Sequence, residues 1–418
     1  MAGALPPDWK IVPFREIADY RLGRTPPRNS DRFWSASSAA FPWVSIADLC
    51  PFGTVNRTTE SVTADAYEEI FQRQLAPAGT LLMSFKLTIG RTSVLDIDAF
   101  HNEAIISIFP RESVDRDFLK FYLPTINFAD HQDRAVKGQT LNRGKIDRLP
   151  VVLPPLDEQR AIAHTLETIR LRVEKEAAIC DKLAALKSAT MAKLFREGLR
   201  GEPLKQTEIG EIPESWEVVR LGDVARITTG TTPSTDEPEY YAGDIPFVRT
   251  AEIDGQIILG SSLHVSHKAV SDYRLKLYPP GTVFVAMYGQ GKTRGRSALL
   301  GVAAATTQNT AAIECFERLV PTYLWHWLDS QYDDLRGMGN LGHLSHLNLG
   351  YVKDLLIPLP CVSEQEEIGS AIDLIRRRLQ VAKDKVRILD QLFRAMLVSL
   401  MTGAIRVKDL DLAEVSHA

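Results

Sequence analysis

Hydrophobic residues recur at alternating spacings of four and three along residues 363–400. This alternation is a heptad repeat, the pattern of a helix that packs lengthwise against another helix. The seam positions are Ile368, Ile372, Ile375, Leu379, Ala382, Val386, Leu389, Phe393, Met396 and Leu400. The segment is predicted to form one long helix of a coiled coil.

The same seam occurs 206 residues earlier, so the chain contains its long helix twice. The earlier positions are Ile162, Leu166, Ile169, Val173, Glu176, Cys180, Leu183, Lys187, Thr190 and Leu194. Three of these, Glu176, Lys187 and Thr190, are polar. Polar seam residues can fix register, contact a third helix or lie at an exposed edge, and the sequence leaves these alternatives open.

The two helices are expected to start in the same way. Asp157 and Ser363 are predicted N-caps, and each is followed by a Glu-Gln pair, at 158–159 and 364–365. The glutamates place negative charge where the helix dipole favours it. The pairs are therefore interpreted as helix starts, with contact to a partner as the alternative.

Motifs before the helices are repeated as well. The pairs are Trp9–Ala18 with Trp216–Ala225, Gly23–Pro26 with Gly230–Pro233, Pro42–Leu49 with Pro246–Ile253, and Pro77–Thr80 with Pro279–Thr282. Offsets between 202 and 207 residues indicate small loop insertions between two copies of one unit. The predicted order is globular unit 1–153, helix 154–200, globular unit 201–359, helix 360–403 and flexible tail 404–418.

Each globular unit is expected to have an α+β fold, with its functional residues in loops. The predicted strands are 81–85, 104–109, 282–287 and 311–316, and the predicted short helices are 114–123 and 320–328.

Chain connectivity favours an antiparallel helix pair. A helix of about 37 residues is roughly 55 Å long, whereas a unit of about 150 residues has a radius of gyration of roughly 15 Å. A unit of that size would not carry the chain back along a parallel partner. We therefore expect similar units at opposite ends of a long antiparallel two-helix coiled coil, related by an internal pseudo-two-fold axis. Such an arrangement suits duplex DNA, whose strands are related by a dyad.

Composition places limits on this interpretation. The formal charge is −4 and the pI is about 6.2, so any DNA site must be a local patch or be shared with a partner. The four cysteines have no paired spacing, which favours a reducing compartment. With no predicted signal peptide or membrane span, a cytoplasmic location is expected.

The whole chain resembles the specificity subunit of type I restriction-modification systems. The resemblance rests on two units that begin Trp-x-x-Val with Gly-x-Thr-Pro soon after, each closed by a proline run, a Glu-Gln pair and a long helix. The proline runs are Val152–Pro155 and Ile357–Pro360. No single motif is specific, but their duplication in this order is.

The resemblance implies a non-catalytic DNA-recognition role within a larger complex. Each unit would read one half of a bipartite target, and the helix pair would set the unread spacer. The implied partners are double-stranded DNA, two methyltransferase subunits that modify adenine N6, and ATP-driven restriction subunits. No cofactor is expected in this chain, while S-adenosylmethionine, ATP and magnesium would belong to the partner subunits.

Basic and amide side chains in loops are the candidate DNA contacts, because they match phosphates and base edges. Lys292, Arg294 and Arg296 would share one side if their backbone were extended. Alternatives for such residues are a solvated basic loop or a simple turn. The full candidate set is Lys292, Arg294, Arg296, Gln290, Lys86, Arg91, Lys137, Gln139, Asn142, Arg143, His343, His346, Asn348, Arg24, Arg28 and Thr231.

Catalytic signatures are weak. Residues 286–293 fit only a relaxed phosphate-loop pattern, and the matching loop of the first unit lacks it. No metal site is expected, because the histidine pairs have no cysteines nearby, and no Asn/Asp-Pro-Pro-Tyr/Phe methylation motif is found. The alternatives are a self-contained DNA modification or restriction enzyme and a structural coiled-coil scaffold.

Overall fold

The computed structural model describes residues 5–35, 40–128, 133–135, 138–289, 292–338 and 347–410. The chain divides into two compact units. Unit 1 comprises Met1–Glu176 and Lys385–Ala418, and unit 2 comprises Ala177–Asp384. Each unit therefore combines one globular region with one half of each of two long helices, α4 (Leu156–Glu197) and α10 (Val362–Met401).

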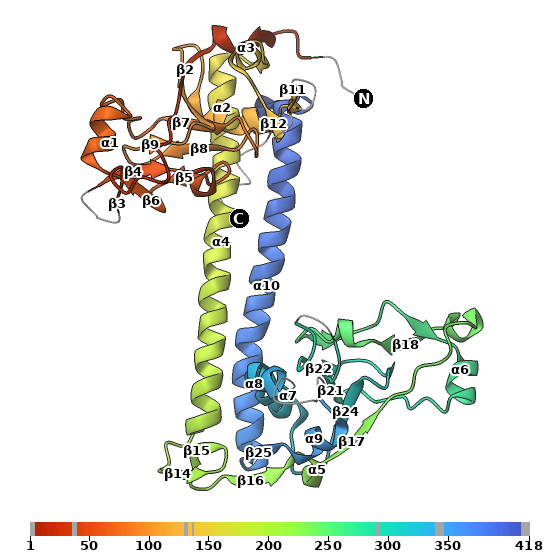
Figure 1. The fold of residues 1–418 in the computed structure, drawn as a ribbon. Coiled ribbons are helices and arrows are strands. Elements are labelled where there is room, and N and C mark those ends of the chain that lie inside the picture. The colour runs from red at the N-terminus through yellow and green to blue at the C-terminus, as the bar shows by residue number, and fades with distance from the viewer. Residues whose placement is uncertain are drawn as a thin grey trace. The chain divides into compact units, whose positions relative to one another are not determined.

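The long helices run antiparallel within each unit (Figure 1). In unit 1, Ile162 near the start of α4 shares a hydrophobic core with Leu400 near the end of α10. In unit 2, Leu194 near the end of α4 shares a core with Ile368 near the start of α10. Every predicted seam residue of both helices is buried or half-buried. The prediction of an antiparallel pair is confirmed.

Two of the three polar seam residues, Glu176 and Lys187, form ion pairs. Glu176 is buried, and the hydrogen bond from Lys385, 2.8 Å away, lowers the pKa of the Glu176 carboxyl. Lys187 reaches a third helix, where its Nζ lies 2.6 Å from the carboxylate of Asp329. Thr190 is half-buried. The exposed-edge alternative is thus wrong for Glu176, and the third-helix alternative is right for Lys187.

Unit 1 is built on a five-stranded sheet in the order β2-β10-β7-β8-β5, with a four-stranded sheet in the order β3-β6-β4-β9 beyond it. Two further pairs are β1-β13 and β11-β12. The elements are β1 (Lys10–Pro13), β2 (Ala18–Leu22), β3 (Trp34–Ser35), β4 (Phe41–Val44), β5 (Thr54–Val55), β6 (Glu60–Val62), α1 (Ala64–Glu69), β7 (Leu81–Ser84), β8 (Thr92–Leu95), β9 (Phe100–His101), β10 (Ile105–Pro110), α2 (Arg116–Tyr122), β11 (Asp133–Ala135), β12 (Gly138–Thr140), α3 (Arg143–Asp147) and β13 (Pro150–Leu153).

Unit 2 repeats this plan, with a five-stranded sheet in the order β17-β24-β21-β22-β19. Its other sheets are β20-β18-β23, β16-β25 and β14-β15. The elements are β14 (Leu204–Thr207), β15 (Gly210–Pro213), β16 (Glu217–Arg220), α5 (Leu221–Val224), β17 (Ala225–Thr229), β18 (Ile245–Val248), β19 (Ile257–Ile258), β20 (His264–Val265), α6 (His267–Asp272), β21 (Val283–Ala286), β22 (Ser297–Leu300), β23 (Ala305–Thr306), β24 (Thr310–Cys315), α7 (Pro321–Ser330), α8 (Tyr332–Met338), α9 (Leu349–Asp354) and β25 (Leu356–Leu359).

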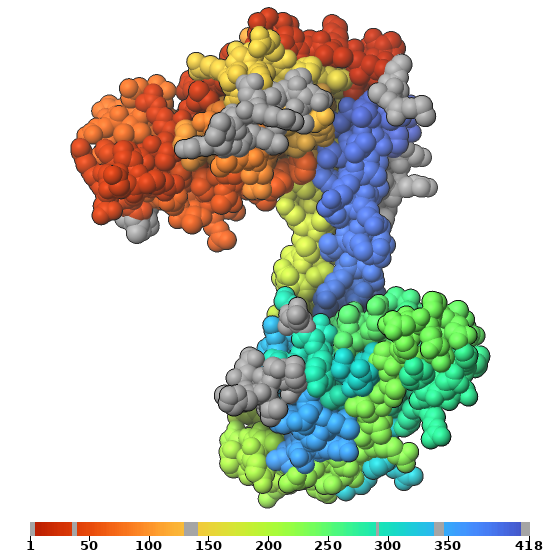
Figure 2. Space-filling model, turned by 45° about the vertical axis from the view of Figure 1, so that its right-hand side comes forward, coloured from red at the N-terminus to blue at the C-terminus, as the bar shows by residue number. Residues whose placement is uncertain are grey.

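The predicted strands correspond to β7, β10, β21 and β24, and the predicted short helices to α2 and α7. Strands β10 and β24 are central, since each pairs antiparallel with a strand on both sides. Long-range antiparallel pairing beside short helices makes each unit an α+β fold, as expected. Figure 2 shows the C-terminal part of α10, in blue, meeting the orange and yellow surface of unit 1.

Side chains of the Glu-Gln pair hold each globular region to the start of its long helix. The indole Nε1 of Trp9 donates to Glu158 at 2.9 Å, and that of Trp216 donates to Glu364 at 3.2 Å. The Trp motif and the Glu-Gln motif therefore contact each other directly in both units.

The glutamines of the two pairs bind in the same way. Gln159 Oε1 accepts from the backbone N–H of Asp115 at 2.8 Å, and Gln365 Oε1 accepts from that of Val320, also at 2.8 Å. In both glutamines Nε2 donates to two backbone carbonyls. The Glu-Gln pairs therefore bind the globular region as well as starting the long helix.

The segment after α10 is ordered as far as Leu410, which corrects the expectation of a flexible tail from residue 404. Val407 is buried and begins a short 3-10 helix, Val407–Asp409. Arg406 forms ion pairs with Glu158 and with Asp8, the latter at 2.7 Å. Residues 411–418 lie outside the described part of the chain.

Candidate nucleic-acid interface

Loops converge at one edge of the five-stranded sheet in each unit. Because neighbouring strands are antiparallel, the ends of β2 and β7 meet the starts of β10 and β8 at the same edge. Unit 2 repeats this with β17, β21, β24 and β22. We call these residues the loop edge: 23–26, 85–91, 102–104 and 141–142 in unit 1, and 230–233, 287–289, 292–296 and 307–309 in unit 2.

Backbone hydrogen bonds tie the unit 1 loops together. Arg24 N–H donates to the carbonyl of His101 at 2.9 Å, and Phe85 N–H donates to that of Ala104 at 2.9 Å. Leu141 N–H in turn donates to the carbonyl of Phe85 at 3.1 Å. The structure therefore brings Arg24, Lys86 and Asn142, which are separate in sequence, onto loops that contact one another.

The glycine of Gly-x-Thr-Pro allows the closest of these contacts. A Cβ atom on Gly23 would lie 2.2 Å from the carbonyl oxygens of His101 and Asn102, and one on Gly230 would lie 1.8 Å from that of Thr306. Only glycine allows such an approach. The motif is thus the junction between the first loop and the strand beside it in both units.

Lys86 and Arg91 flank the loop between β7 and β8. Lys86 is half-buried with its ammonium 5.4 Å from the ring centre of Phe85, and Arg91 donates to the carbonyl of Ile46 at 3.4 Å. Both predicted cations therefore lie on the loop edge. Lys86 is partly exposed, and Arg91 is held by its hydrogen bond to Ile46.

The corresponding cations of unit 2 do not lie on an extended backbone, so that premise of the prediction is wrong. Arg296 N–H donates to the carbonyl of Thr293 at 3.1 Å, and Gly295 has a φ of +82°. Residues 293–296 form a turn directly before β22. The shared side expected for an extended backbone therefore does not apply to Lys292, Arg294 and Arg296.

These cations differ in how they are held. Arg294 Nη2 donates to the carbonyl of Arg336 at 2.8 Å, and the Arg296 guanidinium lies 4.2 Å from the ring centre of Tyr332. Lys292 has an exposed side chain, while its carbonyl accepts from the Tyr332 hydroxyl at 2.7 Å. Lys292 is therefore the best placed of the three for a phosphate.

Asn142 and Asn348 have the same structural role. Each is an N-cap: the Asn142 amide oxygen accepts from Lys145 N–H at 3.0 Å and that of Asn348 from Tyr351 N–H at 2.8 Å. Both residues are exposed. Capping therefore uses the amide oxygen of each residue as an acceptor.

The other candidates are more scattered. Arg24 is exposed and donates to the carbonyl of Ile70, and Arg28 pairs with Glu60 and stacks 4.1 Å from the ring centre of Trp34. Arg143 and Thr231 are exposed. Only the backbone of Gln139 is described, in β12, and Gln290, Lys137, His343 and His346 lie outside the described residues.

Amide residues at the start of β10 and β24 were not singled out from sequence. Asn102 Nδ2 donates to the Thr25 hydroxyl at 3.2 Å, and the Thr232 hydroxyl contacts Gln308. Asn309 occupies the place of Ala104, because its carbonyl accepts from Met287 N–H at 2.9 Å. An Asn or Gln just before a predicted central strand is the signal that could have found them.

His101 is the buried titratable group beneath the unit 1 loop edge. Burial lowers the pKa of its imidazole to about 4, and its Nε2 contacts the Ser107 hydroxyl. The ring is therefore neutral at pH 7 and supports the loops rather than supplying charge.

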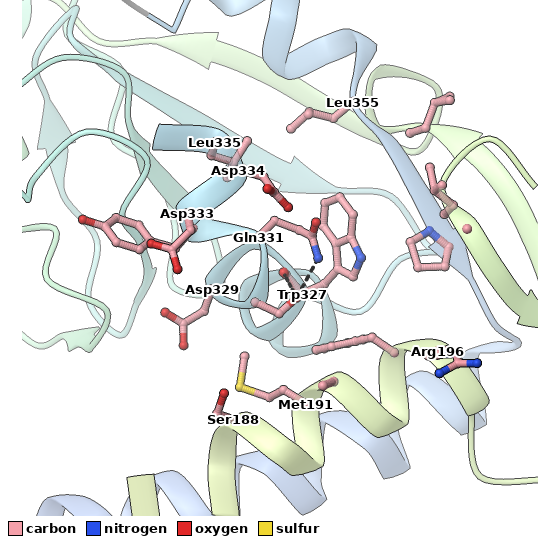
Figure 3. Close-up of a pocket in the computed structure, with 18 of the residues that line it drawn as sticks. Ser188, Met191, Arg196, Trp327, Asp329, Gln331, Asp333, Asp334, Leu335 and Leu355 are labelled. Carbon is pink, nitrogen blue, oxygen red and sulfur yellow. Dashed lines mark hydrogen bonds between the residues drawn. The ribbon is translucent and has the colours of Figure 1, made fainter. Parts of the chain in front are cut away.

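Unit 2 also contains a groove of about 1160 Å³ beside α4 (Figure 3). Its apolar lining includes Met191, Phe195, Trp327, Leu335 and Leu355. Its charged lining is mainly acidic, with Glu208, Glu211, Asp329, Asp333, Asp334 and Asp354 against Lys187, Arg196 and Arg296. Carboxylates repel phosphates, so this groove does not suit DNA.

The described residues show no group of three or more His, Cys, Asp or Glu side chains arranged for a metal ion. In the same part of the chain, no helix has the length and apolar character needed to span a membrane.

Known proteins share both the sequence pattern and the fold. The family model of the type I restriction modification DNA specificity domain matches residues 6–184 and 213–388. The MjaIX type I restriction enzyme specificity subunit of Methanocaldococcus jannaschii is 22% identical over 429 residues, covering 98% of this chain and 96% of that protein.

Among solved structures, the chain is similar to a type I restriction-modification S subunit from M. genitalium, with a TM-score of 0.64 and 12% identity over 94% of this chain and 96% of that one. A structure described for assembly and conformational transition of the type I R-M system gives a TM-score of 0.55 at 19% identity, covering 98% and 100%. These likenesses show a shared fold.

Proposed function

Because the chain belongs to the family of type I restriction-modification DNA specificity proteins, we propose that it is the DNA-recognition subunit of such a complex. Each unit reads one half of a bipartite, asymmetric target, and the helix pair sets the length of the spacer between the halves. The chain itself has no catalytic role.

The duplicated loop edge carries this proposal. Both units present a loop that ends in Gly-Arg, at Arg91 and at Arg296, closed by the same pair of backbone hydrogen bonds to Ser84 and to Ala286. Cations and amides line both edges, but at different positions. Shared backbone geometry with different side chains is what two readers of different half-sites require.

Unpartnered apolar side chains on the long helices support a second part of the proposal. In unit 2, Leu374 and Val381 of α10 are 56% and 68% exposed, and in unit 1 Ile388 and Leu392 are 57% and 43% exposed. Leucines and valines at such positions on a paired helix suit further helices packed outside the pair. We assign these surfaces to docking of two methyltransferase subunits.

The acidic groove of unit 2 suits a protein partner with basic residues better than DNA. The same complex would contain the restriction subunits that cleave unmodified DNA with ATP. S-adenosylmethionine, ATP and magnesium would be bound by those partner subunits.

Single substitutions of loop-edge lysines test the DNA contact. Lys86→Ala and Lys292→Ala should each weaken binding of the assembled complex to its target, because each removes one phosphate contact. Each should also reduce the slope of log Kd against log salt concentration by about 1. The measurement is a salt series of equilibrium binding.

The matched controls are Lys10→Ala and Lys353→Ala, which remove exposed lysines that lie outside the loop edge. They should leave the slope unchanged. Equal slopes for the loop-edge variants and the original protein would remove Lys86 and Lys292 from the interface.

A further inference from the structure

Leu87 lies at the tip of the β7–β8 loop, where its exposure and its backbone conformation are both unusual. Its side chain is 70% exposed and its backbone has a φ of +64°. Leucine rarely adopts this left-handed conformation, which crowds its Cβ against the backbone. The residue at the same distance along the unit 2 loop is Gly289, also with positive φ. Unit 1 thus has a large apolar side chain at a position whose backbone conformation glycine adopts without strain.

Other left-handed residues of the described chain have ordinary structural reasons. Gln72 and Arg73 follow α1, and Arg274 follows α6, where such a residue ends a helix. Phe52 stacks in the core of unit 1, 5.6 Å from the ring of Phe121. Leu87 neither ends a helix nor fills a core.

Contacts at the base of the loop hold Leu87 outward. The buried Ser84 hydroxyl accepts from Arg91 N–H at 3.1 Å and donates to the carbonyl of Thr88. Gly90 N–H donates to the Ser84 carbonyl at 2.8 Å, and a Cβ on Gly90 would lie 2.4 Å from the ring of Phe128. The conformation is therefore fixed by buried neighbours rather than by Leu87 itself.

We propose that Leu87 is an apolar wedge that inserts between stacked base pairs of the half-site bound by unit 1. This rests on the proposed DNA-reading function. Leucine is one of the side chains that unstack base steps in this way. A rigid turn is needed, because a flexible loop would fold the leucine back onto the protein.

The surroundings favour DNA over a protein partner. The residues on either side of Leu87, Lys86 and Thr88, are polar. A leucine in a protein interface is usually surrounded by other apolar side chains. Lys86 instead places a cation beside the wedge, where phosphates flank a base step. Both residues belong to the loop edge already assigned to DNA.

Leu87→Gly and Leu87→Ala test the wedge. Glycine fits the positive φ, so Leu87→Gly keeps the loop and removes only the side chain. The probe is a target duplex with 2-aminopurine placed in turn at each step of the half-site, bound by the assembled complex. Fluorescence should rise at one step with the original protein, and both variants should abolish most of that rise and weaken Kd roughly tenfold.

The control is Leu259→Ala, which truncates an equally exposed leucine of unit 2, 75% exposed. It should change neither signal. Unchanged fluorescence and Kd in Leu87→Gly, or an affinity loss seen only for the methyltransferase subunit, would overturn the wedge while leaving DNA reading intact. A complex that does not distinguish target from scrambled DNA would overturn both proposals.

Discussion

Single buried side chains support the loop edge from below. His101 ends β9 directly under Gly23, in a site so tight that a Cβ on that glycine would touch the imidazole Nδ1 at 2.3 Å. The imidazole is only 6% exposed, so its charged form would be poorly hydrated. The folded structure therefore contains His101 in its neutral form, and this makes the stability of unit 1 depend on pH.

Acid should destabilise unit 1 through His101. Its pKa is lowered from 6.5 to about 4 on folding, so the unfolded chain binds the proton first as pH falls. The stabilisation is complete above about pH 6.5 and is lost towards pH 4, by roughly 1 to 2 kcal/mol between pH 7 and 5. The difference in unfolding free energy between the original protein and His101→Gln should therefore be smaller at pH 5 than at pH 7. Thermal unfolding at these two pH values measures it.

His164→Gln is the control, because His164 is exposed on α4. His164→Gln should destabilise the protein less at pH 7 than His101→Gln does, because it removes no buried side chain. A difference for His101→Gln that is constant from pH 7 to 5 would show that the buried imidazole takes up its proton without cost.

Residue types could be predicted better than residue partners. Lys86, Arg91 and Lys292 stand out as cations in glycine-containing loops, and the structure places them on the loop edge. The stacking of Arg296 on Tyr332 depends on a helix that follows much later in the chain. Sequence spacing contains no information on that contact. The extended-backbone premise failed for a separate reason, the turn that Gly295 allows just before β22.

Elements with strong periodicity were predictable from sequence. The heptads predicted α4 and α10 to within a few residues, because a long apolar stripe with heptad spacing is buried along a second helix. Short runs such as 81–85 and 311–316 became central strands. The role of the Glu-Gln pairs was missed, since their hydrogen bonds run to segments more than 40 residues away.

Helix length should determine the spacer. Inserting seven residues after Cys180 in α4 and seven after Ala382 in α10 keeps both seams in phase. Seven helical residues add about 10 Å, which corresponds to roughly three base pairs of duplex. The preferred spacer of the complex, measured with a library of target duplexes, should lengthen by about that number.

Replacing seven residues at the same points, without insertion, should leave the preferred spacer unchanged. If the insertion variant kept the original preference, the globular regions rather than the helices would set the spacing.

At the scale of the whole molecule, duplication is the feature that matters. Unit 1 and unit 2 have the same order of strands in their main sheets and the same Trp to Glu and Gln to backbone contacts. They differ in the residues of the loop edge, as in Leu87 against Gly289. Under the proposed function, these are two DNA-reading units of one design with separate specificities.

The map of N6-methylated adenines in the host genome, compared with that of a strain lacking this chain, tests this claim most directly. The account predicts that one motif disappears, consisting of two short specified segments separated by an unspecified spacer of constant length. A lost motif that is continuous, or no lost motif at all, would contradict recognition by two separate units.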